Sequence, residues 1–149
     1  MLKAPVIGNI NCIQASSEFA STMSTLLGAG FGVSDALLTT SKVVSNKVIS
    51  NEIKNMAEQV VIGNELGKIM QMNKHFPQVL KEMTAVGEKT GELEATLETV
   101  SDYYTTEYDY EVSKLIGKLE PTMMIFLAIF AGFIVIALYL PMFSMYDLM

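Results

Sequence analysis

The chain has 149 residues, half of them apolar, and its 16 acidic residues outnumber its 10 basic residues, which gives a formal charge of −6. This length fits one domain, or a small domain with an appendage. The acidic balance excludes a general nucleic-acid binder, which needs a basic face for phosphates, so no nucleic-acid partner is expected. One cysteine, Cys12, and one histidine, His75, exclude an intrachain disulfide and a Cys/His zinc cluster.

Residues 1–120 show helical periodicity with short breaks, and strand-like alternation is scarce. We expect a lead-in over residues 1–15 and a helical domain over residues 16–120. Ser34 is predicted to cap a helix that has Asp35 in its first turn, where the helix dipole favours a carboxylate. The first four predicted helices cover about residues 11–29, 34–45, 47–62 and 65–72, and the fifth begins at residues 76–77 and ends near residues 87–91.

A long sixth helix is predicted over residues 93–120, because apolar residues step by three or four along it. Pro121 is expected either to kink the junction that follows or to begin a new helix. Six helices with brief loops predict an all-α fold, a six-helix antiparallel bundle.

No residue from 121 to 146 is charged, and residues 122–145 are apolar on every side. A helix needs about 20 such residues to cross the bilayer core. We therefore predict one transmembrane helix over residues 121–146, rather than a buried core helix, and an external tail over residues 147–149. Lys114 and Lys118 precede the span and no lysine follows it, so the positive-inside rule predicts that residues 1–120 are cytoplasmic.

No motif for catalysis is complete, so we do not expect an enzyme and assign no catalytic or cofactor-binding residue. A dinucleotide loop would need glycine where Val33 stands, and a phosphate-binding loop would need glycine where Glu88 stands. Nine carboxylates fall within residues 82–111. They indicate a solvated helix face, with a divalent-cation site or a patch for a basic partner as alternatives.

Several short motifs occur in an order that resembles the type II secretion F family, the PilC and GspF platform proteins of the inner membrane. Residues 87–93 match its G-E-x-S/T-G-x-L signature, and an E-P pair stands at the entry to the predicted span. Phe19, Phe76 and Tyr104 fall in further matching segments. The residues that carry the two main motifs are Gly87, Glu88, Gly91, Leu93, Glu120 and Pro121.

The resemblance implies a non-enzymatic platform that couples a cytoplasmic ATPase to pilin or pseudopilin assembly. Its implied partners are the assembly ATPase, other inner-membrane secretion or pilus proteins, the pilin or pseudopilin, the membrane and further copies of the chain. Whether the system builds a pilus, secretes proteins or takes up DNA (competence) stays open. The alternative is a generic membrane-anchored helical adaptor or regulator unrelated to secretion.

Full members of the family carry two copies of the helical domain and about three spans. The resemblance therefore implies that this chain corresponds to the second copy and the final span, as a fragment, a split gene product or a reduced member. Some members bind calcium between helical domains. By motif position, the corresponding ligands here would be Asp35, Glu88 and Glu92, while no other cofactor is implied.

Overall fold

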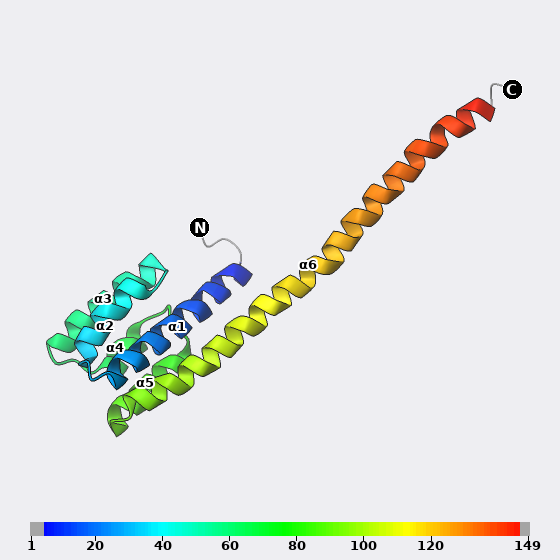
Figure 1. Cartoon of the computed structure of the whole chain (residues 1–149). Helices are drawn as coiled ribbons and strands as arrows, with labels where there is room; N and C mark the ends of the chain where they lie inside the picture. Colours follow the sequence, from blue (N-terminus) through cyan, green and yellow to red (C-terminus); the bar gives the residue numbers. More distant parts are fainter. Residues whose placement is uncertain (1–4, 147–149) are drawn as a thin grey trace. The chain divides into compact units, whose positions relative to one another are not determined.

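The computed structural model describes residues 5–146, so the predicted tail, residues 147–149, and the first four residues of the lead-in lie outside it. Two compact units divide the chain, Met1–Tyr110 and Glu111–Met149. Across the described residues the fold is all-α, which confirms the predicted fold class. The six helices are α1 (Pro5–Gly28), α2 (Val33–Val43), α3 (Lys47–Val61), α4 (Leu66–Met72), α5 (Gln78–Thr90) and α6 (Leu93–Tyr146) (Figure 1).

The largest differences from the predicted boundaries are at three places. Helix α1 begins at Pro5, well before residue 11. The residue that caps α2 is Gly32, so Ser34 lies inside the first turn, although Asp35 is in that turn as expected. The predicted sixth helix and the apolar segment are one helix, α6, and Pro121 lies inside it rather than at the start of a new helix.

The apolar core of the first unit draws on all six helices. Phe76, in the loop before α5, packs on Phe19 of α1 with ring centroids 5.1 Å apart. Burying a side chain of this size contributes about 1.5–3 kcal/mol. The first turns of α6 belong to this core through Leu93, Leu97, Val100 and Tyr104. Other buried members are Met23, Leu37, Ile53, Leu66 and Leu80.

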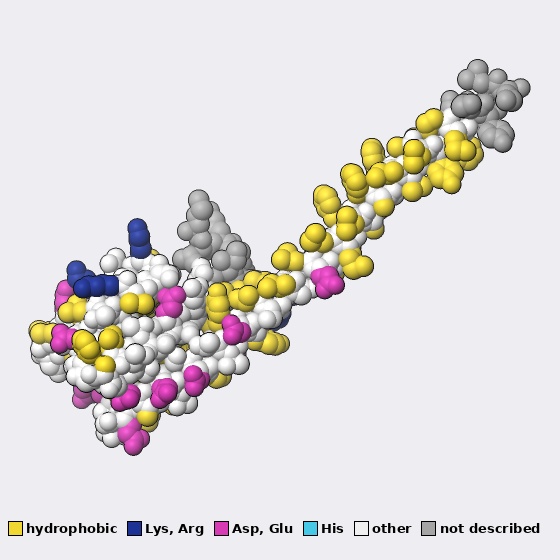
Figure 2. Space-filling model, in the orientation of Figure 1, with side chains coloured by type: hydrophobic (Ala, Val, Ile, Leu, Met, Phe, Trp, Pro, Cys, Tyr) yellow, Lys and Arg dark blue, Asp and Glu magenta, His cyan; other side chains and the backbone are white. Residues whose placement is uncertain are grey.

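The apolar part of α6 is not buried against any other described part of the chain. Its most apolar window has a mean hydropathy of 2.8 and no buried residue. Phe126 is 75% exposed and Phe133 is 69% exposed, and yellow apolar side chains cover this stretch in Figure 2. A core helix would be buried, so this exposure argues against the core-helix alternative. The helix is long and apolar enough to span a membrane.

Candidate functional site

The predicted motif, residues 87–93, forms the sharp corner between α5 and α6. Gly91 follows the last residue of α5 with φ +75°, a left-handed conformation that glycine adopts without a Cβ penalty. The backbone N–H groups of Gly91 and Glu92 both donate to the Gly87 carbonyl, the second over 2.9 Å. Leu93 then enters the core. These residues therefore end one helix and begin the next.

Gly87 is buried where α5 meets the first turns of α6. A Cβ atom at this position would lie 2.9 Å from Thr96 Oγ1 and 3.0 Å from Leu93 Cα. Non-bonded carbon atoms prefer about 3.5–4.0 Å, so any side chain here would push the two helices apart.

Glu88 makes the long-range contact of the motif. Its Oε1 accepts a hydrogen bond from the Leu66 backbone N–H at 2.7 Å, and its Oε2 accepts one from the Gly67 N–H at 2.6 Å. Both N–H groups belong to the first turn of α4, where no carbonyl of the helix can reach them and the helix dipole is positive. The half-buried Glu88 carboxylate thus caps a helix that precedes it by 21 to 22 residues.

Helix α4 approaches α5 very closely at the same place. A Cβ atom on Gly67 would lie 2.7 Å from Ala85 Cα, 2.8 Å from Ala85 Cβ and 3.2 Å from Glu88 Oε2. Only glycine permits this approach, which brings the two N–H groups within reach of the Glu88 carboxylate. The sequence analysis singled out neither Gly67 nor Ala85. Helical periodicity predicts which face of one helix is buried, but it does not predict which residues of two helices touch.

The predicted calcium ligands lie in three different settings. Asp35 is exposed in the first turn of α2, and Glu88 is bonded to the amides of α4. Glu92 stands beyond Gly91, which ends α5, so Glu88 and Glu92 do not share one continuous helix face. The described part of the chain holds no group of three His, Cys, Asp or Glu side chains that could hold a metal ion. Within the described residues, the three predicted ligands therefore do not come together as one group.

Glu120 and Pro121 lie inside α6, in the second unit. Proline has no N–H, so the Gly117 carbonyl one turn earlier has no helical hydrogen bond from residue 121. Glycine also weakens a helix interior by about 1 kcal/mol relative to alanine. The turn from Gly117 to Pro121 is therefore intrinsically weak.

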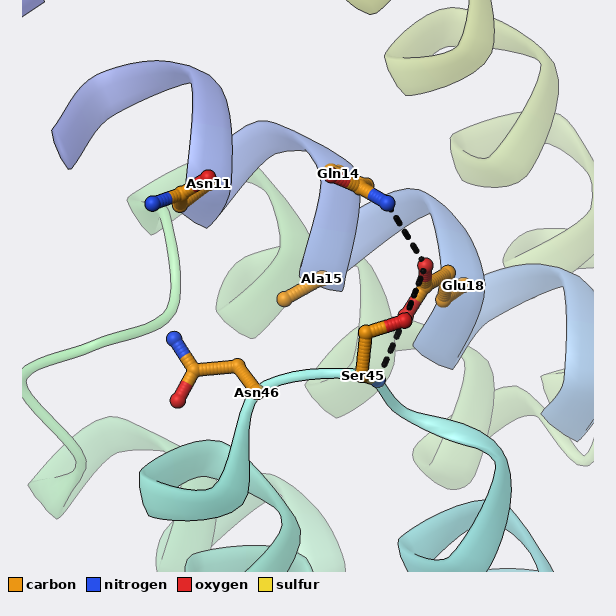
Figure 3. A pocket seen from close by; sticks show the side chains of 6 residues that line it. All are labelled: Asn11, Gln14, Ala15, Glu18, Ser45 and Asn46. Carbon is orange, nitrogen blue, oxygen red and sulfur yellow. Dashed lines mark hydrogen bonds between the residues drawn. The ribbon is translucent and has the colours of Figure 1, made fainter. Parts of the chain in front are cut away.

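Two further carboxylates join segments that the sequence analysis did not connect. Glu18 of α1 accepts hydrogen bonds from the Ser45 backbone N–H at 3.0 Å, the Ser45 hydroxyl at 3.1 Å and the Gln14 side chain at 3.0 Å (Figure 3). These bonds attach the turn between α2 and α3 to α1. The spacing of residues 18 and 45 carries no signal for this contact.

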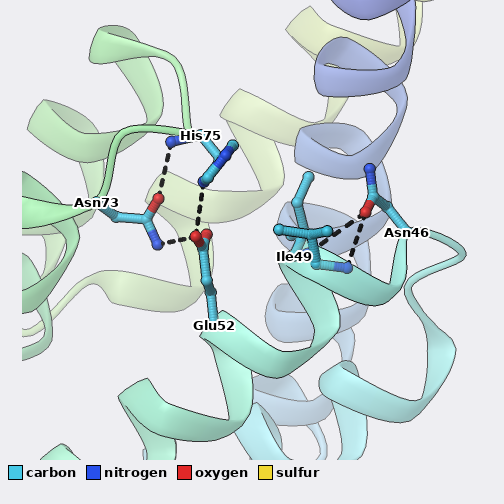
Figure 4. A network of polar contacts seen from close by, with 6 residues as sticks. Asn46, Ile49, Glu52, Asn73 and His75 are labelled. Atoms are coloured by element: carbon cyan, nitrogen blue, oxygen red, sulfur yellow. Dashed lines mark hydrogen bonds and ion pairs between the residues drawn. The ribbon is translucent and has the colours of Figure 1, made fainter. Parts of the chain in front are cut away.

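Glu52 of α3 reaches the loop between α4 and α5. It accepts a hydrogen bond from the Asn73 amide at 2.8 Å, and its Oε1 lies 2.6 Å from His75 Nδ1 (Figure 4). The sequence predicts a solvated loop position for His75. The side chain is indeed half-exposed in a loop, but it also has a carboxylate partner.

Residues 19–141 match the family described as "Type II secretion system (T2SS), protein F". The chain belongs to the type II secretion system protein F family. The match begins inside α1 and includes α2 to α5, the corner at residues 87–93 and most of the apolar stretch of α6, and it confirms the family that the motifs predict.

Relatives in this family come from both pilus and secretion systems. The chain is 34% identical over 145 residues to the type IV pilus assembly protein PilC of Pseudomonas aeruginosa, with 97% of this chain and 39% of that protein covered. It is 33% identical over 144 residues to PilC of Thermus thermophilus, with 96% and 36% covered. Type II secretion system protein F of P. aeruginosa is 29% identical over 148 residues, with 99% and 36% covered. The chain thus spans less than two fifths of the length of these relatives.

Proposed function

We propose that the chain is part of a non-enzymatic inner-membrane platform that couples a cytoplasmic ATPase to pilin or pseudopilin assembly. The observation that carries the proposal is the family match, which spans the helical unit and the apolar helix together. Relatives are named for type IV pili and for type II secretion, so either machine fits. Membership of this family counts against a generic adaptor unrelated to secretion.

The charges around the apolar segment support a cytoplasmic location for the first unit. Lys114 and Lys118 precede the segment, and no lysine follows it. Lysines are enriched on the cytoplasmic side of membrane spans. In this orientation residues 1–120 share a compartment with an assembly ATPase, as the proposal requires.

Helix α6 offers a physical route for coupling. It runs from the core of the first unit into the apolar segment without a loop. We propose that motion imposed on the first unit enters the membrane along this helix. The weak turn from Gly117 to Pro121 supplies a place at which the helix can bend, because kinks in long helices occur mainly at proline.

Replacing Glu120 and Pro121 together by alanine tests the coupling route. Alanine at 121 restores a helical N–H and removes a residue that costs about 3 kcal/mol in a helix interior, so the turn stiffens. We expect assembled pili or secreted protein to fall several-fold while the amount of the variant in the membrane stays normal. Glu120→Ala alone is the control. Unchanged assembly by the double variant would remove the mechanical role of this turn.

Partner capture tests the proposed function itself. Tagged full-length chain, purified from mildly solubilised membranes of its host, is expected to carry the assembly ATPase, other inner-membrane secretion or pilus proteins, and untagged copies of the chain. A tagged membrane protein of similar size serves as the control. Membranes that yield the chain without any secretion or pilus component would contradict the proposal.

Calcium binding by Asp35, Glu88 and Glu92 stays a prediction from the resemblance. Hard oxygen ligands suit calcium, but Glu88 would have to release the α4 amides to bind it. The test is thermal unfolding of the purified chain with and without millimolar calcium. A rise in melting temperature that Glu92→Gln abolishes would support the site, whereas no shift would remove it.

A further inference from the structure

A lysine patch surrounds a hollow at the end of α2 and the start of α3. We define it by Lys42, Lys47 and Lys54, which are exposed and line a hollow of about 460 Å³ together with serine and apolar side chains. No carboxylate lines this hollow. Within the described residues, none of the three lysines has an ion-pair partner. In a chain of net charge −6, this is a local excess of unpaired positive charge.

An acidic ridge runs along α6 within the first unit. We define it by Glu98, Asp102 and Asp109, all exposed and without a side-chain partner among the described residues. At 100° per residue these positions fall within about 40° of arc, so they form one ridge about 16 Å long. Figure 2 shows lysines gathered at one edge of this unit and a row of acidic side chains along another.

The two surfaces cannot pair inside one chain, because α1 lies between them. Ser17 of α1 shares a hydrogen bond of 2.8 Å with Thr105 of α6. The neighbouring Glu18 accepts a hydrogen bond from the Ser45 backbone N–H in the turn between α2 and α3. Helix α1 therefore bridges the segments that carry the ridge and the patch, and within one chain it keeps them apart (Figure 1).

We infer that the lysine patch of one copy of this chain binds the acidic ridge of a second copy. Lys47 and Lys54 are two helical turns apart, about 10 Å along α3, which fits within the length of the ridge. Each copy offers both halves of the contact, and copies confined to one membrane meet at a high effective concentration. A contact between two different surfaces repeats head to tail, which builds a ring or an open row of copies. The inference rests on the self-association included in the proposed function.

Charge reversal tests the contact in the full chain. Purified chain in mild detergent is studied by sedimentation velocity at about 50 mM and about 0.5 M salt, since screening weakens exposed charge pairs. We expect oligomers at low salt and at least tenfold weaker association at high salt. The patch reversal (Lys42→Glu, Lys47→Glu, Lys54→Glu) and the ridge reversal (Glu98→Lys, Asp102→Lys, Asp109→Lys) are each expected to be monomeric.

Mixing the two charge-reversed variants tests most directly whether the patch binds the ridge. The acidic patch of one variant then faces the basic ridge of the other, so we expect a mixed oligomer to form. The control variant carries Lys68→Glu, Lys74→Glu and Lys89→Glu, which change the net charge by the same amount as the patch reversal but lie outside the patch. This variant should associate like the wild type. Circular dichroism confirms folding of each variant. A monomeric wild type, reversals without effect, or folded reversed chains that do not associate when mixed would overturn the inference. Sedimentation velocity measures the mass of the oligomer. This inference can therefore fail while the proposed role in secretion or piliation still holds.

Discussion

Replacing Glu88 by alanine is expected to lower the free energy of unfolding of the first unit by about 2–4 kcal/mol. The substitution removes two charge-assisted hydrogen bonds and leaves the Leu66 and Gly67 N–H groups without their carboxylate. The measurement is urea unfolding of the full chain in detergent, combined with hydrogen exchange. We expect the amides at the start of α4 to exchange faster than those of α3.

A matched substitution separates this capping role from a general effect of charge. Glu82 lies on the same helix, is exposed and contacts only the nearby Gln78 side chain among the described residues. Glu82→Ala should change the free energy of unfolding by less than about 0.5 kcal/mol. If Glu88→Ala were no more destabilising than Glu82→Ala, the capping role of Glu88 would be wrong.

Replacing Gly67 by alanine should destabilise the first unit by about 3 kcal/mol. The new Cβ atom would lie 2.7 Å from Ala85 Cα, and a backbone atom cannot rotate away as a flexible side chain can. Overpacking of this kind typically costs about 1–3 kcal/mol, and here it would also push α4 away from Glu88. Thermal unfolding followed by circular dichroism measures the loss.

Two variants sharpen this second experiment. Gly8 lies in α1 with nothing near its missing Cβ, so Gly8→Ala should stabilise the chain by about 0.5–1 kcal/mol. Ala85→Gly in the Gly67→Ala background removes only the contact with Ala85 Cβ, so it should restore part of the loss. Equal effects of Gly67→Ala and Gly8→Ala would show that α4 and α5 are not closely packed.

Helical periodicity predicted the all-α fold and most helix bounds, because the buried faces of α3 and α5 repeat at helical spacing. It missed the first turns of α1, where Gly8 and Asn9 interrupt the apolar pattern and are poor helix formers. It also placed the N-cap at Ser34, whereas α2 begins at Val33 and its N-cap is Gly32. Local residue preferences compete closely at helix ends, so such positions are the least predictable.

The corner at residues 87–93 was recognised as a motif, but its physical role required three dimensions. Gly91 can be predicted as a helix stop from local chemistry alone. The partners of Glu88 cannot be predicted in this way, because they are backbone amides of α4. Nearly every residue has a backbone amide, so the sequence does not show which ones Glu88 binds. Glu88 and Glu92 are four residues apart and would share a face only on a continuous helix, which the left-handed Gly91 interrupts.

The central proposal is that this chain drives subunit assembly from the inner membrane. The most direct measurement is the partition of pilin or pseudopilin between the inner membrane and the assembled fibre, in host cells with the gene deleted and then restored. We expect subunits to accumulate in the membrane without the chain and to return to the fibre with it. Normal fibre assembly in the deletion strain would show that the chain does not drive assembly.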